Sequence, residues 1–449
     1  MPSNKHPREI ERLHELVDRA AALLRVGRQG VVCVSASLRG APDPLSWVAA
    51  AQDEVRAYWS VRDHTIAGVG AAVRISASGP DRFVDAERAW REIVTRATTA
   101  GSASVRPLAI GGFSFDPRSR WRGFPALCFV VPRVTLESRR GTTLVTLTIA
   151  RGAGAVRELR AARRDLARLV DAVPLESRPA RIIGGRSVPI DSTWLRAVAR
   201  TAADVRARRI SKVVLARARL LVAGEPIDPG TVVARLRDAN RGARVFWIGT
   251  PSGSFVGASP EWLARLRGRC VRTAALAGSL VPGLPGALLL DSVKDRIEHA
   301  LVVKDITGRL RPMCDRVVAA SRPVVVPIGY IQHLTTPIAG HLRARTGLFG
   351  VTARLHPTAA IAGAPRQKAL AVIRRREPLA RGWYGGGVGW MDSSGDGDIA
   401  VAIRSALLRG RRARVFAGAG IVAMSRQEAE LSETETKLKP MLRALGVGE

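Results

Sequence analysis

Short apolar runs rich in β-branched residues recur along the chain. The clearest of them lie at 30–38, 142–150, 212–220, 244–250, 254–259 and 414–422. Most are bounded by glycine, charged or turn-forming residues, and runs of this length and composition are typical of β-strands. The pattern therefore predicts a protein with many strands.

A second pattern places apolar residues three and four positions apart, which predicts amphipathic helices. Ile10, Leu13, Val17, Ala20 and Leu24 follow it near the N-terminus. Further helices are expected at 155–172, 192–208, 291–312, 364–376 and 426–445. Because the helices separate clusters of strands without strict strand–helix–strand alternation, we expect an α+β fold.

The stretch VDAVPLESRPARIIGG, residues 170–185, is the clearest candidate seam in the chain. It would separate an N-terminal portion, 31–180, from a core, 185–445, with an amphipathic helix at 1–30 ahead of both. By itself the composition leaves two alternatives open, a domain boundary or a crossover within one domain.

The overall composition is that of a globular protein, with 46% hydrophobic and 24% charged residues among 449. No apolar run approaches the roughly 18 residues of a membrane span. The N-terminus is rich in acids and does not look like a signal peptide. Four scattered cysteines, Cys33, Cys128, Cys270 and Cys314, predict buried thiols in a reducing cytoplasm.

The net charge of +33 is unusual and raises nucleic-acid binding as an alternative function. The basic residues are mostly arginines spread along the whole chain, with no concentrated tail. Aromatic residues make up only 5%, so stacking platforms for bases would be few. A basic, non-catalytic nucleic-acid-binding protein is therefore the less favoured class.

One acidic stretch stands out in this basic chain, SRQEAELSETETKLKPM at 425–441. Ser425 and Glu428 have the spacing of a helix capping box. Glu430, Glu433 and Lys437 then share one helix face. This face is either solvated, with a weak Glu433–Lys437 ion pair, or a source of the hard oxygen ligands that Mg²⁺ prefers.

A second acidic helix favours the metal interpretation. In the stretch 291–310, Ser292 and Asp295 again have capping-box spacing, and Asp295 and Glu298 lie three residues apart. Two helices that each carry such a pair of carboxylates could face each other across a cation.

Ten motifs, in this order, resemble the chorismate-utilising enzymes, a family that includes isochorismate, salicylate, anthranilate and aminodeoxychorismate synthases. They are SKVVLAR (211–217), FVGASPEWL (255–263), ALAGS (275–279), KDRIEHALVV (294–303), IQHLTTPIAGHL (331–342), LHPTAAIAGAPR (355–366), RGWYGGGVGW (381–390), GDGDIAVAIRSALL (395–408), FAGAGIV (416–422) and ELSETETKL (430–438). The stretch at 110–136 also resembles the isochorismate synthase branch, so the resemblance covers nearly the whole chain.

The resemblance implies a single enzyme domain over 31–449, built from two large, mostly antiparallel sheets packed as a sandwich with peripheral helices. The 170–185 stretch is then not a domain boundary. The implied substrate is chorismate and the implied cofactor is Mg²⁺. We expect a cytoplasmic monomer or weak dimer with no membrane association.

The resemblance also implies an acid–base pair. Lys212 resembles the family's water-activating lysine, and Glu261 resembles the acid that protonates the leaving C4 hydroxyl. Burial would shift both pKa values toward these roles. Ammonia-using relatives lack that lysine, and LHPT (355–358) is closest to isochorismate synthases, so no glutaminase subunit is expected. The closest alternative is a salicylate synthase, which goes on to eliminate pyruvate.

The remaining site residues follow from the same resemblance. Glu298 and Glu433 are the expected Mg²⁺ ligands, with Glu430 and Asp295 acting directly or through water. Arg404, expected in a strand beside Ala400, Ala402 and Ala406, would clamp a substrate carboxylate. The full set of expected substrate-binding residues is Gly278, Ser279, His333, Thr358, Tyr384, Arg404, Gly418, Gly420 and Lys437.

Overall fold

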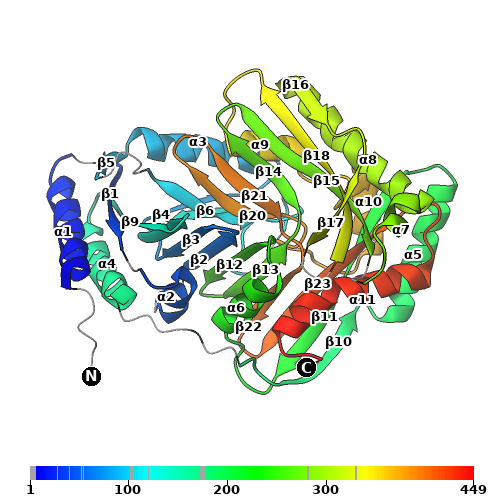
Figure 1. The fold of residues 1–449 in the computed structure, drawn as a ribbon, viewed down its shortest axis with the longest axis horizontal. Helices are drawn as coiled ribbons and strands as arrows, with labels where there is room; N and C mark the ends of the chain where they lie inside the picture. Colours follow the sequence, from blue (N-terminus) through cyan, green and yellow to red (C-terminus); the bar gives the residue numbers. More distant parts are fainter. Residues whose placement is uncertain are drawn as a thin grey trace.

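Two large β-sheets form the centre of the protein, seen here in a computed structural model (Figure 1). The structure describes residues 7–448 except 28, 40, 52, 54, 102–105, 120, 171–174, 176–177, 281–282 and 329–330. Part of the 170–185 stretch thus lies outside the described residues. The α+β class and the two mostly antiparallel sheets are confirmed.

The larger sheet combines strands from both portions of the chain. In spatial order it contains β10 (Ile182–Val188), β11 (Lys212–Ala223), β23 (Arg412–Ile421), β22 (Ser405–Arg409), β13 (Gly253–Ser259), β12 (Arg244–Thr250), β2 (Arg56–Val61), β3 (His64–Val69), β8 (Val134–Arg139), β9 (Thr142–Ala150), β1 (Val31–Leu38) and β5 (Thr98–Ala100). A short strand, β19 (Gly363–Ala364), also pairs with β11. Only β1 and β5 run parallel within the described pairs. The β2–β12 pairing joins the two portions.

The smaller sheet is joined in the same way. Its order is β16 (Cys314–Ala319), β18 (Ile331–Leu342), β15 (Cys270–Leu280), β14 (Trp262–Arg267), β21 (Gly397–Val401), β20 (Gly387–Asp392), β6 (Leu108–Phe113), β7 (Leu127–Val131) and β4 (Val73–Ala77), with β17 (Val324–Ile328) on β18. Here β6 pairs with β20. Each sheet is therefore held together by hydrogen bonds between distant parts of the sequence.

Helices cover the outer faces of the sheets and the ends of the molecule. They are α1 (Pro7–Leu24), α2 (Pro44–Ala50), α3 (Arg82–Thr95), α4 (Ala155–Val170), α5 (Asp191–Arg206), α6 (Pro229–Ala239), α7 (Ala287–Asp291), α8 (Val293–Leu310), α9 (Leu348–Leu355), α10 (Arg366–Arg376) and α11 (Gln427–Ala444), with a 3₁₀ turn at Arg311–Met313. In Figure 1, α1 and α4 lie at one end of the molecule, while α5, α8 and α11 lie at the other. No helix in the described part of the chain has the length and apolarity needed to cross a bilayer.

Aromatic side chains fill the space between the sheets. Trp59, Phe246 and Phe255 from the larger sheet pack with Trp390 of the smaller sheet and with Trp383. These large rings are nearly inaccessible to solvent. Because interiors are close-packed, this layer fixes the distance between the sheets and leaves open space only where the ring packing ends.

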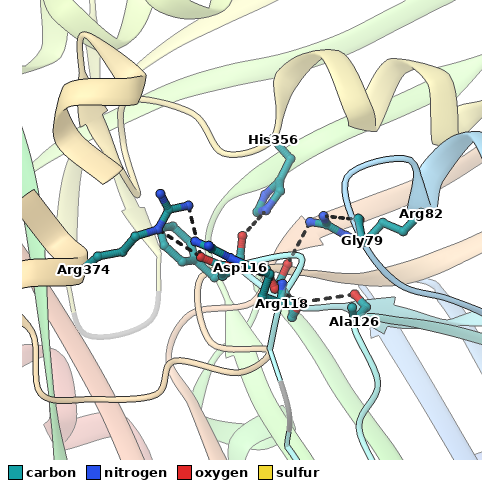
Figure 2. A network of polar contacts seen from close by, with 9 residues as sticks. Gly79, Arg82, Asp116, Arg118, Ala126, His356 and Arg374 are labelled. Atoms are coloured by element: carbon teal, nitrogen blue, oxygen red, sulfur yellow. Dashed lines mark hydrogen bonds and ion pairs between the residues drawn. The ribbon is translucent and has the colours of Figure 1, made fainter. Parts of the chain in front are cut away.

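A polar network ties the N-terminal portion to the core near α10 (Figure 2). Arg374 contacts the Asp116 carboxylate at 3.3 Å, and His356 Nε2 lies 3.1 Å from the Phe115 carbonyl oxygen. Arg82 donates to the Ser114 carbonyl at 3.3 Å. These contacts hold the segment that follows α9, which reaches the cavity described below.

Removal of one buried contact of α11 is expected to destabilise the fold. Leu438 is fully buried in the cluster that packs α11 against β23. We expect Leu438→Ala to lower the free energy of unfolding by about 2–5 kcal/mol, because it leaves a cavity. Urea unfolding followed by circular dichroism measures this. Exposed Lys439→Ala is the matched control, expected within about 0.5 kcal/mol of wild type; equal values for both variants would contradict the packing.

Candidate active site

A cavity with about 620 Å³ of empty space opens where β11 and β23 meet β15, β18, α8 and α11. Apolar side chains form part of its wall: Val214, Leu276, Ile361, Ile403 and Phe416. The cavity thus combines an apolar lining with polar groups from several elements.

Most of the residues expected from the sequence line this one cavity. They are Glu261, Gly278, Ser279, Glu298, His333, Tyr384, Arg404, Gly418, Gly420, Glu433 and Lys437. Lys212, Asp295, Glu430 and Thr358 are not part of its wall. Lys212 and Asp295 lie directly behind wall residues, and Glu430 lies about one helical turn before the wall residue Glu433 on α11.

Lys212 lies behind the wall and pairs with a wall carboxylate. It is the first residue of β11 and is 1% exposed, and its Nζ lies 3.0 Å from Glu298 Oε1. Gly420 makes room for this pair, since a Cβ atom there would lie 2.2 Å from Glu298 Oε1 and 2.8 Å from Lys212 Cε. The ion pair joins β11 to α8.

Glu261 is a buried carboxyl in the segment between β13 and β14, only 4% exposed. Its backbone is fixed to β21, because the Val401 amide donates to its carbonyl at 3.1 Å. Burial raises the pKa of Glu261 to about 8, although the charges of Lys212 and Lys437 act in the opposite direction. At neutral pH this carboxyl keeps its proton and can donate it.

Two carboxylates on α11, Glu433 and Glu430, are each paired with a lysine. Glu433 lies 2.5 Å from Lys437 Nζ, and Glu430 lies 2.6 Å from Lys294 Nζ. Burial and the charge of Glu433 raise the pKa of Glu430 to about 7. Burial also acts to raise the pKa of Glu433, but nearby cations, Lys437 foremost, hold it below its usual value. Glu433 is therefore the ionised member of this pair.

Within the described residues, no group of three or more histidine, cysteine, aspartate or glutamate side chains is close enough to form a ready-made metal site. Glu298 and Glu433, from two helices, nevertheless face the same cavity. Mg²⁺ commonly takes one or two protein carboxylates and completes its shell with substrate oxygens and water. Behind them, Glu430 Oε2 is buried without a partner. The donor set therefore fits Mg²⁺ in the presence of a substrate.

Asp295 and Thr358 lie beside the cavity wall. Asp295 packs under Gly278, where an added Cβ would lie 3.2 Å from the Asp295 side chain. The Ser292 hydroxyl accepts from the Asp295 amide at 3.2 Å, which confirms the expected cap of α8. The Thr358 carbonyl instead accepts from the Ile361 and Ala362 amides, a turn that brings Ile361 to the wall.

Two local expectations were wrong. The capping box on α11 does not form: Ser425 Oγ accepts from the Val422 amide, the cap residue is Arg426, and Glu428 is exposed. Arg404 does not lie in a strand. Residues 402–404 carry the chain from β21 in the smaller sheet to β22 in the larger one, and Arg404 has φ +52°. This kink directs Arg404 to the cavity, because the chain must change sheets here.

Arg404 offers charged hydrogen-bond donors to the cavity, and neutral His333 offers an acceptor. Arg404 donates to the Lys437 carbonyl at 3.2 Å, and burial lowers its pKa to about 10, so it stays charged at neutral pH. His333 Nδ1 lies 3.1 Å from the Gly278 carbonyl and therefore carries the proton. Burial lowers the pKa of His333 to about 3. Its buried Nε2, without a partner among the described residues, is left as an acceptor.

The sequence-based reasoning missed two groups that hold the site. Lys294 pairs with Glu430, and its position in KDRIEH was the available signal. Arg381, from RGWYGGG, donates to the carbonyls of Ile361 (3.0 Å) and Val214 (2.8 Å) and pairs with buried Glu377 at 2.7 Å. Arg381 thus fixes two residues of the cavity wall.

Comparison with known proteins agrees with this geometry. The family model described as chorismate binding enzyme matches residues 18–446. The chain is 34% identical over 414 residues to isochorismate synthase MenF of Bacillus subtilis, covering 87% of this chain and 88% of that protein. It is 35% identical over 434 residues to the salicylate biosynthesis isochorismate synthase of Pseudomonas aeruginosa, covering 92% and 90%.

A solved structure of MenF, the menaquinone-specific isochorismate synthase from Escherichia coli, has a similar fold. It superposes with a TM-score of 0.83 at 27% identity, covering 96% of this chain and 99% of that one. The resemblance inferred from the ten motifs is confirmed. The protein is a member of the chorismate-binding enzyme family.

Proposed function

We propose that the protein is a Mg²⁺-dependent isochorismate synthase, which converts chorismate to isochorismate. The observation that supports this best is that a candidate acid and a candidate base lie at the same cavity. A buried, protonated Glu261 faces it, and a buried lysine lies behind one of the two carboxylates that line it. The names of the two relatives above support the same activity.

In the proposed reaction, water bonds to C2 of the ring and the C4 hydroxyl leaves as water. Lys212, once it has given up the proton that it holds in its pair with Glu298, would take a proton from the attacking water. Glu261 gives its proton to the departing hydroxyl, so the charges balance. Burial suits Glu261 to this role, because desolvation raises its pKa and favours the neutral acid.

Glu298 and Glu433 would hold Mg²⁺, with Glu430 and Asp295 supporting them from behind the wall. When bound, Mg²⁺ would neutralise a substrate carboxylate and compete with the Lys212 ammonium for Glu298. Glu298 and Glu433 are also paired with Lys212 and Lys437, respectively.

The polar wall suits a dicarboxylate with a free hydroxyl. Arg404 can clamp one carboxylate bidentately, and Tyr384 lies beside it on the wall. Gly418 leaves room for Tyr384, since a Cβ there would lie 2.9 Å from the tyrosine hydroxyl. Neutral His333 offers Nε2 as an acceptor for a substrate hydroxyl. Gly278, Ser279, Gly420 and Lys437 complete the proposed contacts, with Thr358 behind them.

Incubation with chorismate and Mg²⁺ tests the proposal directly. We expect isochorismate as the product on chromatography, because the proposed base, Lys212, would act on water and not on ammonia. Fluorescent salicylate would instead indicate that the enzyme goes on to eliminate pyruvate. Anthranilate formed with ammonium salts, without isochorismate, would contradict the proposal.

The acid–base assignment predicts a pH effect. Since Glu261 acts as its protonated form and its pKa is about 8, turnover should fall as the pH rises through about 8. Glu261→Gln and Lys212→Ala should each lower kcat by about 100-fold or more. Steady-state kinetics from pH 6 to 9 measure both effects. Exposed Glu225→Gln serves as the control, and a Glu261→Gln enzyme with wild-type turnover would refute the assignment.

The metal assignment predicts a change in Mg²⁺ affinity. Glu433→Ala removes one of the two cavity carboxylates and should weaken Mg²⁺ binding at least about tenfold. Calorimetric titration with a substrate-like dicarboxylate present measures this independently of activity. Glu428→Ala, on an exposed position of the same helix, is the control. An unchanged titration in Glu433→Ala would exclude that ligand.

A further inference from the structure

A second, wider groove lies on the same face of the larger sheet as the active-site cavity. It encloses about 1320 Å³ of empty space. Its most prominent side chains are Arg186 of β10, Leu220 of β11, Leu407 and Arg409 of β22, and Arg412 and Arg414 of β23. Four arginines from three strands therefore meet at one surface.

Strand register places these side chains in two rows. In the first row, Arg186, Leu220, Arg414 and Leu407 are neighbours on four successive strands. In the second row, Val222 pairs with Arg412, which pairs with Arg409. Successive residues on one face of a strand are about 6.7 Å apart, so the rows are separated by that distance. The result is two positive rows, of which the first alternates arginine with leucine.

No carboxylate neutralises this cluster among the residues that the structure describes, where none of the four arginines forms an ion pair. Arg409 Nη2 donates to the Arg122 carbonyl at 2.7 Å, while its buried Nε has no partner among the described residues. Burial, together with the charges of Arg414 and Arg122, lowers the pKa of Arg409. Arg409 and Arg412 are directly opposed across the hairpin, an arrangement of like charges that destabilises a sheet.

On the opposite face of β11, two other arginines of the larger sheet are paired with acidic side chains. Arg217 and Arg219 also belong to β11, but Arg217 pairs with Asp191 and Glu435, and Arg219 pairs with Glu435. The four groove arginines differ from these two, because no acidic partner is seen for them among the described residues. Their repulsion lowers stability unless an external anion compensates it.

We propose that this groove binds a small organic dianion, with two carboxylates on an apolar ring or chain. Guanidinium groups bind carboxylates in a bidentate manner. The arginines of the two rows can bind two charged ends, and Leu220 and Leu407 of the first row offer an apolar surface to the body of the ligand. A bare inorganic anion would satisfy the arginines but leave the leucines exposed.

The groove is separate from the active-site cavity. Along β23 the residues that face this side are Arg412, Arg414, Phe416 and Gly418, so Arg414 lies about 13 Å from Gly418. Trp121 lines the groove and stacks on Phe416 (centroids 5.5 Å apart), which stacks on Tyr384 of the cavity (5.0 Å). This aromatic stack divides the two sites, and the proposal does not depend on the reaction proposed above.

Calorimetric titration of the full chain with isophthalate, at near-physiological salt, tests the groove. Arg412→Gln combined with Arg414→Gln should weaken this binding at least tenfold. The control Arg272→Gln with Arg316→Gln removes the same charge from exposed positions of β15 and β16 and should leave binding unchanged. Arg404→Gln, which alters the cavity, should also leave groove binding intact.

Further ligands and a stability readout separate the outcomes. Benzoate should bind more weakly than isophthalate, and so should pyrophosphate. Arg412→Gln alone should melt at the same or a higher temperature, because it relieves the opposed charges. Equal isophthalate affinity in the groove and control variants would overturn the proposal. So would steeply salt-dependent DNA binding through these arginines with no isophthalate binding.

Discussion

The ion pair between Lys212 and Glu298 is the contact on which the active site depends. It joins the start of β11 to α8 at 3.0 Å, in an environment where the lysine is almost fully buried. Loss of one partner of such a pair leaves an uncompensated buried charge, at a cost of about 3–5 kcal/mol. The close approach requires Gly420, because no other side chain leaves room there. The proposed base and a proposed metal ligand are thus positioned by one interaction.

Burial then gives neighbouring ionisable groups different protonation states. Glu261 has few compensating partners, so its pKa rises to about 8, while Glu433 is surrounded by cations and stays ionised. His333 is kept neutral by burial. Carboxyls whose environments move their pKa values apart are suited to separate roles as acid and ligand. The same cavity wall therefore presents both a protonated and an ionised carboxyl.

Much of the arginine in this chain has a structural role that composition could not reveal. Arg133 is neutralised by Asp53, Glu158 and Asp165, and Arg244 pairs with Asp398 across the two sheets. Such pairs hold strands and helices from distant parts of the sequence in register. The groove on β10, β11, β22 and β23 is different, because its arginines face solvent-accessible space without acidic partners. Part of the net charge of +33 is thus concentrated in this groove, where it would attract an anionic ligand.

Local patterns in the sequence by themselves determined the helices near 155–172 and 426–445, the main strands, and the order of motifs that identified the family. The structure placed these helices at Ala155–Val170 and Gln427–Ala444, because amphipathic periodicity is a local property. Only the tertiary structure decided the strand order, the kink at Arg404 and the roles of Lys294 and Arg381. These depend on contacts between segments far apart in the chain, and so do the pKa values, since burial is a property of the packed molecule.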